Sequence, residues 1–186
     1  MERVGGVDVA YRGSRYWAAL AVCAEGVGPD VTWESGLSHE PYRSTLFFLK
    51  EAPLISRLVY DRDIDLLFVN GHGTCHPFHF GLATAVGVTH GIPTVGVARR
   101  LIRGDYTWRA TGSPSVHLIV QSGTVVGAAV RRSPAASPLF VSPGYGLTVA
   151  EAVLQYFKWI RKGKLPEPLR LAHLHSRRLV RAAATP

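Results

Sequence analysis

Residues 65–69 form an almost uninterrupted apolar run that stops at a polar, glycine-rich segment. The next four residues are Asn70, Gly71, His72 and Gly73. A short run with no polar alternation is typical of a strand whose two faces are both covered by helices. Glycines at the end of such a strand allow positive φ angles and close approach of a ligand to backbone N–H groups, although a plain tight turn would use the same residues. The sequence therefore predicts an α/β fold with a candidate site at this strand end.

The patterns on either side predict three strands in succession, followed by alternating helices and strands. The predicted strands are residues 4–11, 15–24, 30–37, 65–69, 92–98, 116–121 and 124–130. The predicted helices are residues 41–60, 80–90, 150–163 and 166–180, the third of them opened by a capping box at Thr148 and Glu151. Pro53 predicts a break or kink in the first helix, and a turn is expected over residues 25–29. This order predicts a single domain, residues 1–186, with a mixed sheet whose first three strands are antiparallel and whose later strands are parallel, covered by helices on both faces.

The composition is that of a globular domain with a sizeable core, because 47% of the 186 residues are apolar. No apolar run approaches the roughly 18 residues that a membrane-spanning helix needs, so no membrane partner is expected. A strand pattern that begins at Val4 predicts that no signal peptide is present. Cys23 and Cys75 do not have a metal-binding spacing, and we expect a reduced, monomeric, cytoplasmic protein.

Twenty-one lysines and arginines against 13 aspartates and glutamates give the chain a formal charge of +8. The basic residues include short clusters at residues 99–103, 131–132, 161–164 and 177–178. The aromatic residues near these clusters are Tyr106, Trp108, Tyr156 and Trp159. Basic groups beside aromatic rings suit phosphate contact and base stacking, so nucleic acid is the predicted partner. A basic surface kept for solubility, with Tyr156 and Trp159 in a helix core, is the alternative.

Two acidic residues and three histidines are the candidates for chemistry. Asp8 interrupts an apolar strand, where an unpaired carboxylate would cost several kcal/mol, so it needs a cation or strong hydrogen-bond donors. A structural salt bridge would explain Asp8 as well as a metal site would. Glu51 lies on a predicted helix, where a glutamate is usually solvated. His72, His76 and His79 lie close in sequence, but no cysteine pair or third spaced ligand completes a tetrahedral zinc site.

Taken in order, the segments of this chain resemble the endonuclease V family, and the resemblance covers nearly the whole chain. Residues 69–73 are similar to the Val-Asp-Gly-His-Gly signature of that family, and residues 6–11 resemble its first metal-binding strand. Pro41 and Tyr42 resemble the start of its Pro-Tyr-Ile-Pro-Gly loop. Further similar segments are residues 76–83, 92–99, 139–144 and 165–173. The resemblance, like the order of the predicted elements, implies a ribonuclease H-like fold.

The resemblance implies a Mg²⁺-dependent nuclease, with Mn²⁺ as a substitute, that acts on inosine-containing DNA or RNA in the repair of deaminated bases. Cleavage is implied at the second phosphodiester 3′ to the inosine. The implied catalytic residues are Asp8, Glu51, Asn70 and His173, and the implied metal ligands among them are Asp8, Asn70 and Glu51. The implied substrate-binding residues are Tyr42 as a wedge, Gly71, Gly73 and His76 around the base, and Arg99 at the phosphate.

The chain departs from the family pattern at positions that matter for this activity. Asn70 stands where the family has a metal-binding aspartate, and it keeps a carbonyl oxygen but loses a unit charge. At short range that loss is on the order of several kcal/mol, enough for about a hundredfold drop in rate. Residues 43–45 differ from the Ile-Pro-Gly of the wedge loop, and Tyr145 replaces a histidine. Three hypotheses remain: a weakened nuclease, a catalytically inactive nucleic-acid-binding relative, or an engineered aspartate-to-asparagine change.

Overall fold

The computed structural model describes residues 1–38, 46–107, 113–133 and 135–184. Trp108, Tyr42 and the wedge-loop residues Arg43, Ser44 and Thr45 lie outside the described residues. The strands are β1 (Arg3–Arg12), β2 (Arg15–Ala24), β3 (Val27–Leu37), β4 (Leu66–Val69), β5 (Thr94–Ala98), β6 (Ser115–Gln121), β7 (Thr124–Arg131) and β8 (Leu139–Tyr145). The helices are α1 (Phe47–Val59), α2 (Leu82–His90), α3 (Val149–Lys158) and α4 (Glu167–Ala182). Within the described residues, no helix is long and apolar enough to cross a membrane.

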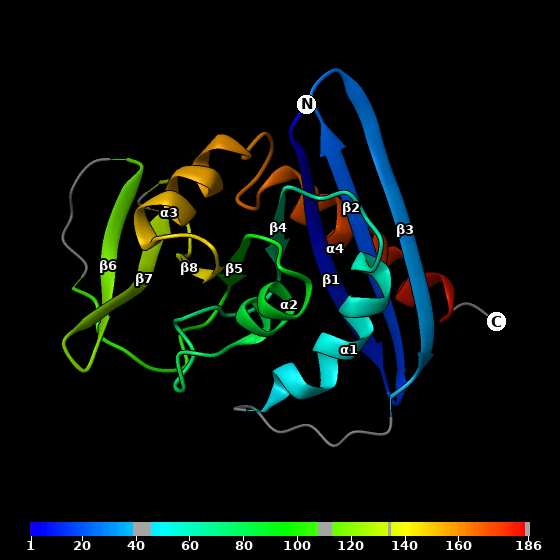
Figure 1. Ribbon diagram of the computed structural model, residues 1–186, viewed down its shortest axis with the longest axis horizontal. Helices are drawn as coiled ribbons and strands as arrows, with labels where there is room; N and C mark the ends of the chain where they lie inside the picture. The colour runs from blue at the N-terminus through cyan, green and yellow to red at the C-terminus, as the bar shows by residue number, and fades with distance from the viewer. Residues whose placement is uncertain (39–45, 108–112, 134, 185–186) are drawn as a thin grey trace.

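One eight-stranded sheet, in the order β3-β2-β1-β4-β5-β8-β7-β6, organises the described chain (Figure 1). The first three strands are antiparallel, β4 is parallel to β1, and β5 is parallel to β4. These pairings confirm the α/β fold and the mixed sheet. Of the later strands, β4 and β5 are parallel as predicted, whereas β8, β7 and β6 are joined to the sheet by antiparallel pairing. A parallel centre is thus flanked by antiparallel strands on both sides.

The sequence did not predict β8 as a strand. It contains Pro143 and Gly144, which are poor strand residues because proline cannot donate to the ladder and glycine has no side chain to pack. The register with β5 shifts opposite this segment, between Thr94 and Val95. β8 nevertheless lies inside the sheet between β5 and β7, with Val141 fully buried. The pairing of β8 with two neighbouring strands therefore overrides the low strand propensity of Pro143 and Gly144.

The helices cover both faces of the sheet, as predicted, and each face has its own core. Figure 1 shows α1 and α2 in front of the sheet and α4 behind it. On one face, Leu54 of α1 packs in the same cluster as Val86 of α2. On the other face, Tyr156 of α3, Trp159 and Leu169 of α4 pack together. Tyr156 and Trp159 are therefore core residues, not rings for base stacking.

Several predicted breaks and boundaries differ from the structure. α1 continues through Pro53, because the burial of neighbouring Leu54 in the core offsets the backbone hydrogen bond that proline removes. α3 ends at Lys158 and not at Gly163, and β3 begins at Val27, so the turn after β2 is tighter than predicted. The predicted capping box is present at the start of α3.

Gly6 sets the distance between β1 and α4. A Cβ atom at this position would lie 2.1 Å from the backbone nitrogen of Leu169, so a side chain here would push the helix off the strand. Asp8 lies two residues further along β1 and therefore faces the same side of the sheet. His173 lies one helical turn beyond Leu169 and faces the same strand. The close contact at Gly6 thus brings the polar residues of α4 to Asp8.

Candidate active site

Asp8 is the centre of a buried polar cluster, with only 2% of its surface exposed. Its Oδ1 atom accepts a hydrogen bond from the Asn70 amide. Its Oδ2 atom accepts from the Ser176 hydroxyl and lies 3.2 Å from Nδ1 of His173. Burial alone would raise the pKa of Asp8, but these hydrogen bonds and the electrostatic interaction with His173 together hold that pKa below its ordinary value. Asp8 is therefore an ionised carboxylate with donors at both oxygens.

Asn70 reaches Asp8 because β4 lies beside β1. Val69 is paired with Val7, and the Asn70 backbone N–H donates to the Val7 carbonyl oxygen at 3.2 Å. The side-chain nitrogen of Asn70 faces Asp8, since an amide oxygen in that place would repel the carboxylate. Asn70 is consequently a hydrogen-bond donor to Asp8, and its amide oxygen, the atom that a cation would bind, is turned away from that carboxylate.

Glu51 projects from α1 into the same site and is 4% exposed. Burial raises its pKa well above the ordinary range, and the negative charge of Asp8 raises it further. A hydrogen bond with the Tyr11 hydroxyl and the nearby Lys50 ammonium oppose this shift without cancelling it. Lys50 also lies 4.5 Å from the centre of the Tyr11 ring. The site therefore shifts the pKa values of its two carboxyl groups in opposite directions, lowering that of Asp8 and raising that of Glu51.

His173 links Asp8 to Arg99. The Arg99 Nη2 atom lies 3.0 Å from Nε2 of His173. Because a guanidinium group can only donate, Nε2 accepts and the ring proton is on Nδ1, where it is donated to Asp8. The three side chains form a chain of hydrogen bonds from the exposed Arg99 to the buried carboxylate. Arg99 is thus the solvent-exposed end of this chain of hydrogen bonds.

The glycine-rich segment is shaped by the neighbouring strand β8. A Cβ atom at Gly73 would lie 2.0 Å from the Pro143 carbonyl oxygen, so β8 requires glycine there. The Gly73 N–H donates to the Ser142 hydroxyl at 3.0 Å, and the Gly71 N–H donates to the Val69 carbonyl at 2.9 Å. Neither glycine has a positive φ. Both N–H groups are therefore bonded within the protein.

His72 and His76 differ in their surroundings. Burial lowers the pKa of His72 to about 4, and the ring has a hydrogen bond to the backbone of Arg100. Its Nδ1 atom is buried without a partner among the described residues. His76 is also buried, and its Nδ1 accepts from the Phe78 backbone N–H at 3.3 Å. His72 is therefore an uncharged core residue. In His76, the Phe78 backbone occupies Nδ1, so Nε2 points away from that backbone.

The carboxyl groups of Asp8 and Glu51 are the feature of this site that suits a divalent cation. In the described part of the chain, no three His, Cys, Asp or Glu side chains are arranged to hold a metal ion on their own. Asp8 and Glu51 are nevertheless buried in one site, and a cation would favour the ionised form of both. Rotation of the Asn70 amide would add a neutral oxygen ligand. The donor set therefore fits a hard divalent cation. It has two charged ligands, Asp8 and Glu51, and an aspartate at position 70 would make a third.

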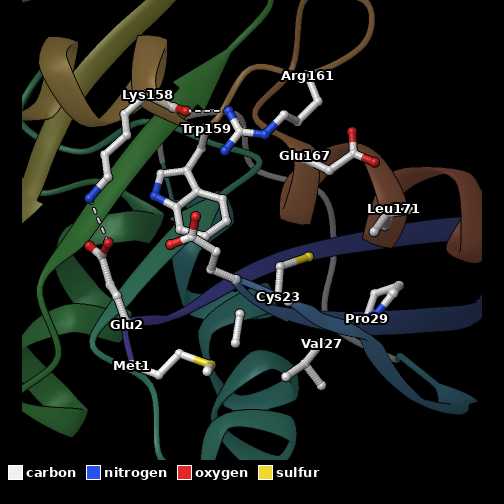
Figure 2. Close-up of a pocket in the computed structure, with 13 residues that line it drawn as sticks. Met1, Glu2, Cys23, Val27, Pro29, Lys158, Trp159, Arg161, Glu167 and Leu171 are labelled. Atoms are coloured by element: carbon white, nitrogen blue, oxygen red, sulfur yellow. Dashed lines mark hydrogen bonds and ion pairs between the residues drawn. The ribbon is translucent and has the colours of Figure 1, made fainter.

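A cavity of about 650 Å³ lies away from this cluster, at the start of β1 (Figure 2). Its lining includes Glu2, Cys23, Lys158 and Arg161. Glu2 is six residues from Asp8, about 20 Å along an extended strand. Figure 2 shows Lys158 turned toward Glu2, with which it forms an ion pair of 2.5 Å, and Arg161 bonded to the Lys158 carbonyl at 2.7 Å. Glu2, Lys158 and Arg161 are thus bonded to other residues of the same chain. We therefore place the candidate active site at Asp8 and not at this cavity.

The sequence model of the family Endonuclease V matches residues 1–174. The chain belongs to the endonuclease V family. Its class is therefore that of the endonucleases, which are hydrolases. Endonuclease V of Methanopyrus kandleri is 40% identical over 185 residues, spanning 96% of this chain and 79% of the relative. Endonuclease V of Thermofilum pendens is 36% identical over 185 residues, spanning 95% and 77%.

Solved structures of the same family have the same fold. Endonuclease V of Streptomyces avermitilis is 30% identical with a TM-score of 0.86, covering 98% of this chain and 83% of that one. Human ENDOV is 29% identical with a TM-score of 0.84, covering 99% and 86%. Endonuclease V of Ciona intestinalis, in complex with DNA containing an inosine, is 22% identical with a TM-score of 0.78, covering 98% and 87%, a likeness in fold alone. These similarities confirm the predicted ribonuclease H-like fold.

The sequence predicted the candidate residues Asp8, Glu51, Asn70 and His173, and the structure brings these four side chains together. The sequence did not predict Ser176 or Tyr11. Ser176 is fully buried and donates to Asp8, and Tyr11 is a hydrogen-bond partner of Glu51. The signals were present but weak. Ser176 follows His173 by three residues on one helix, a spacing that places both on the same face.

Proposed function

We propose that this protein recognises inosine in DNA or RNA and hydrolyses the second phosphodiester 3′ to it with Mg²⁺ or Mn²⁺, at a rate reduced by Asn70. The observation that carries this proposal is the convergence of Asp8, Asn70, Glu51 and His173 from β1, the end of β4, α1 and α4. Membership of the endonuclease V family supports it, as does the inosine-containing DNA bound by the Ciona intestinalis relative. A monomeric cytoplasmic protein in the repair of deaminated bases is part of the same proposal.

The side chains of Asp8 and Glu51, with the amide oxygen of Asn70, would hold the cation. When bound, a divalent cation supplies charge neutralisation at the phosphate and lowers the pKa of a coordinated water. His173 keeps the Asp8 carboxylate in place through Nδ1, and Arg99 would contact the substrate phosphate from the other side of that ring. The extruded base would lie against Gly71, Gly73 and His76.

Asn70 weakens this site in two ways. It removes one unit of negative charge from the ligand set, and its N–H group occupies the Asp8 oxygen that a cation needs. The hydrogen bonds at both oxygens of Asp8 also favour a second candidate function, that of a nucleic-acid-binding relative without catalysis. Under that alternative, the +8 charge would still attract the phosphate backbone.

A cleavage assay separates the two functions. Oligonucleotides of DNA and RNA, each with inosine or adenosine at one position, are incubated with the protein and Mg²⁺ or Mn²⁺, and product ends are mapped. Slow cleavage at one phosphodiester 3′ to inosine supports the nuclease. Binding that weakens steeply with added salt, without any cleavage, supports the binding protein. Binding that does not change between low and physiological salt contradicts both.

A further inference from the structure

Three phenylalanine rings and His76 form a continuous strip beside the candidate active site. The rings are arranged in the order Phe80, Phe48, His76, Phe78. Neighbouring ring centres are 5.7, 5.7 and 5.5 Å apart, and their planes are inclined by 69°, 85° and 51°. These are edge-on and tilted contacts, which leave ring faces uncovered by the neighbouring ring. We call these four residues the aromatic strip.

The two ends of the aromatic strip are open to solvent. Phe78 is 62% exposed and Phe80 is 39% exposed, whereas His76 between them is buried. Single exposed apolar residues are common on protein surfaces, but here both belong to one connected set of rings. Exposing phenylalanine forgoes roughly 25 cal/mol for each Å² left in water, so folding gains little from these positions. A surface of this kind suits a ligand with flat apolar faces.

The backbone holds the two exposed rings apart. His79, the residue between them, has a φ of 52°, a left-handed conformation that costs a non-glycine residue on the order of 1 kcal/mol. Backbone N–H groups of Phe78 and His79 donate to Nδ1 and the carbonyl oxygen of His76, at 3.3 and 2.8 Å. Nδ1 of His79 lies 3.3 Å from the Thr74 carbonyl oxygen. The strained turn is thus held by hydrogen bonds that fix where Phe78 and Phe80 leave the chain.

The aromatic strip begins at the edge of the site. Phe48 and Glu51 are three residues apart on α1, which places their Cβ atoms about 5–6 Å apart on one helix face. His76 follows Gly73 by three residues, and its backbone N–H donates to the Gly73 carbonyl at 3.2 Å. A strand bound at Asp8 would therefore pass within reach of the exposed rings.

We propose that the aromatic strip is a stacking surface for an unpaired nucleobase that flanks the inosine, so that the substrate is a single strand or a locally opened duplex. This inference rests on the proposed function, because it places the strand at Asp8. Bases in an intact duplex stack on one another, whereas an unpaired base can stack on phenylalanine whatever its identity. The net charge of +8 supplies the attraction for the strand's phosphates.

Binding measurements without metal test this proposal apart from catalysis. The probes are two labelled single strands of equal length, one with all bases and one with abasic sites around the inosine, followed by fluorescence anisotropy. Phe78→Ala and Phe80→Ala should each weaken binding of the complete strand by about fivefold or more. Neither should change binding of the abasic strand or the salt dependence, since the phosphate contacts are the same. Leu118→Ala is the matched control, because Leu118 is 55% exposed on β6 and should have no effect.

A gain-of-signal variant makes the test independent of lost stability. Phe78→Trp should retain binding, and fluorescence from the new indole should be quenched by the complete strand but not by the abasic one. The proposal is overturned if the alanine variants bind the complete strand as well as the parent does, if they weaken both strands equally, or if the parent binds neither strand. If the parent binds but even Asn70→Asp does not cleave inosine-containing strands, the proposed function fails and the stacking surface stands.

Discussion

Asp8 and Glu51 are buried carboxyl groups of one site, yet their pKa values move in opposite directions. Asp8 is 2% exposed and its pKa is lowered, whereas Glu51 is 4% exposed and its pKa is raised. Burial therefore does not distinguish them. The difference lies in their partners. Asp8 accepts hydrogen bonds from Asn70, His173 and Ser176. Glu51 has one hydrogen bond, with the Tyr11 hydroxyl, and the positive charge of Lys50 lowers its pKa by less than burial and Asp8 raise it.

The two environments indicate how this site manages negative charge. Beside β1, three donors stabilise the charge of Asp8, Asn70 at the end of β4 and His173 and Ser176 on α4, whereas on the α1 side burial and the charge of Asp8 raise the pKa of Glu51. A second aspartate at position 70 would place another carboxylate against Asp8 with no donor between them. Asn70 therefore takes over, as a donor, part of the role that a cation would have in such a site.

Asn70→Asp should have the largest effect. We expect Mg²⁺-dependent cleavage of inosine-containing strands to rise by at least about a hundredfold, because the variant restores a charged ligand and releases the Asp8 oxygen. Metal affinity should rise with it, and without metal the variant should be less stable than the parent. Cleavage rates and calorimetric Mg²⁺ titration measure the two effects.

The control is Asn70→Ala, which removes the amide without adding a charge and should therefore not raise cleavage above the level of the parent protein. If Asn70→Asp gains neither metal affinity nor activity, position 70 is not a metal-ligand position. If it gains metal affinity and cleaves inosine- and adenosine-containing strands equally, the base pocket has lost its selectivity.

Asp8→Ala should lower the free energy of unfolding by about 2 kcal/mol, since buried donors on Asn70 and His173 would lose their acceptor. Urea denaturation followed by circular dichroism measures the change. Asp63→Ala is the control, because that side chain is 80% exposed and its contact with Arg3 is a loose one of 3.7 Å. An Asp8→Ala variant as stable as the control would mean that the hydrogen bonds around Asp8 do not stabilise the fold.

The sequence predicted the fold better than it predicted these environments. Apolar runs and turn residues identify β1, β2 and β4 because those strands agree with their local propensity, while β8 was missed because Pro143 and Gly144 oppose it. Asp8 was predicted since an acid in an apolar strand is unusual. The donor from Ser176 was missed, because its spacing from His173 is only a weak signal and the contact with Asp8 depends on how closely Gly6 lets α4 approach β1. The raised pKa of Glu51 likewise depends on its burial in the folded chain and on Asp8, which is distant from it in sequence.

Glu51→Gln should change how stability depends on pH. Because folding raises the pKa of Glu51, the stabilising contribution of its protonated form is present below the unfolded pKa and is lost as the pH rises through the folded pKa. The glutamine variant cannot ionise, so it should match the parent in acid and exceed it in stability above that range. Thermal unfolding measured across a range of pH tests this expectation.

Glu167→Gln is the control with the opposite expected pH dependence, because the hydrogen bond with Arg170 lowers the pKa of Glu167. A parent protein whose stability does not fall relative to Glu51→Gln at high pH would contradict a raised pKa for Glu51.

Ser176→Ala should have the smallest effect, a loss of about 1 kcal/mol in the free energy of unfolding. The hydroxyl of Ser176 lies near both Oδ2 of Asp8 and, at 3.1 Å, the His173 carbonyl oxygen, and its single proton is donated to the carboxylate. Its loss should raise the pKa of Asp8 toward the ordinary range, so that stability is lost at a higher pH on acidification.

Ser142→Ala is the matched control for this variant. Ser142 is equally buried, and its hydroxyl accepts from the Gly73 N–H at 3.0 Å without touching Asp8. Both variants should lose a similar amount of stability at neutral pH, but only Ser176→Ala should shift the acid transition. Equal acid transitions in the two variants would mean that Ser176 contributes packing alone, and that Asn70 and His173 are sufficient to keep Asp8 ionised.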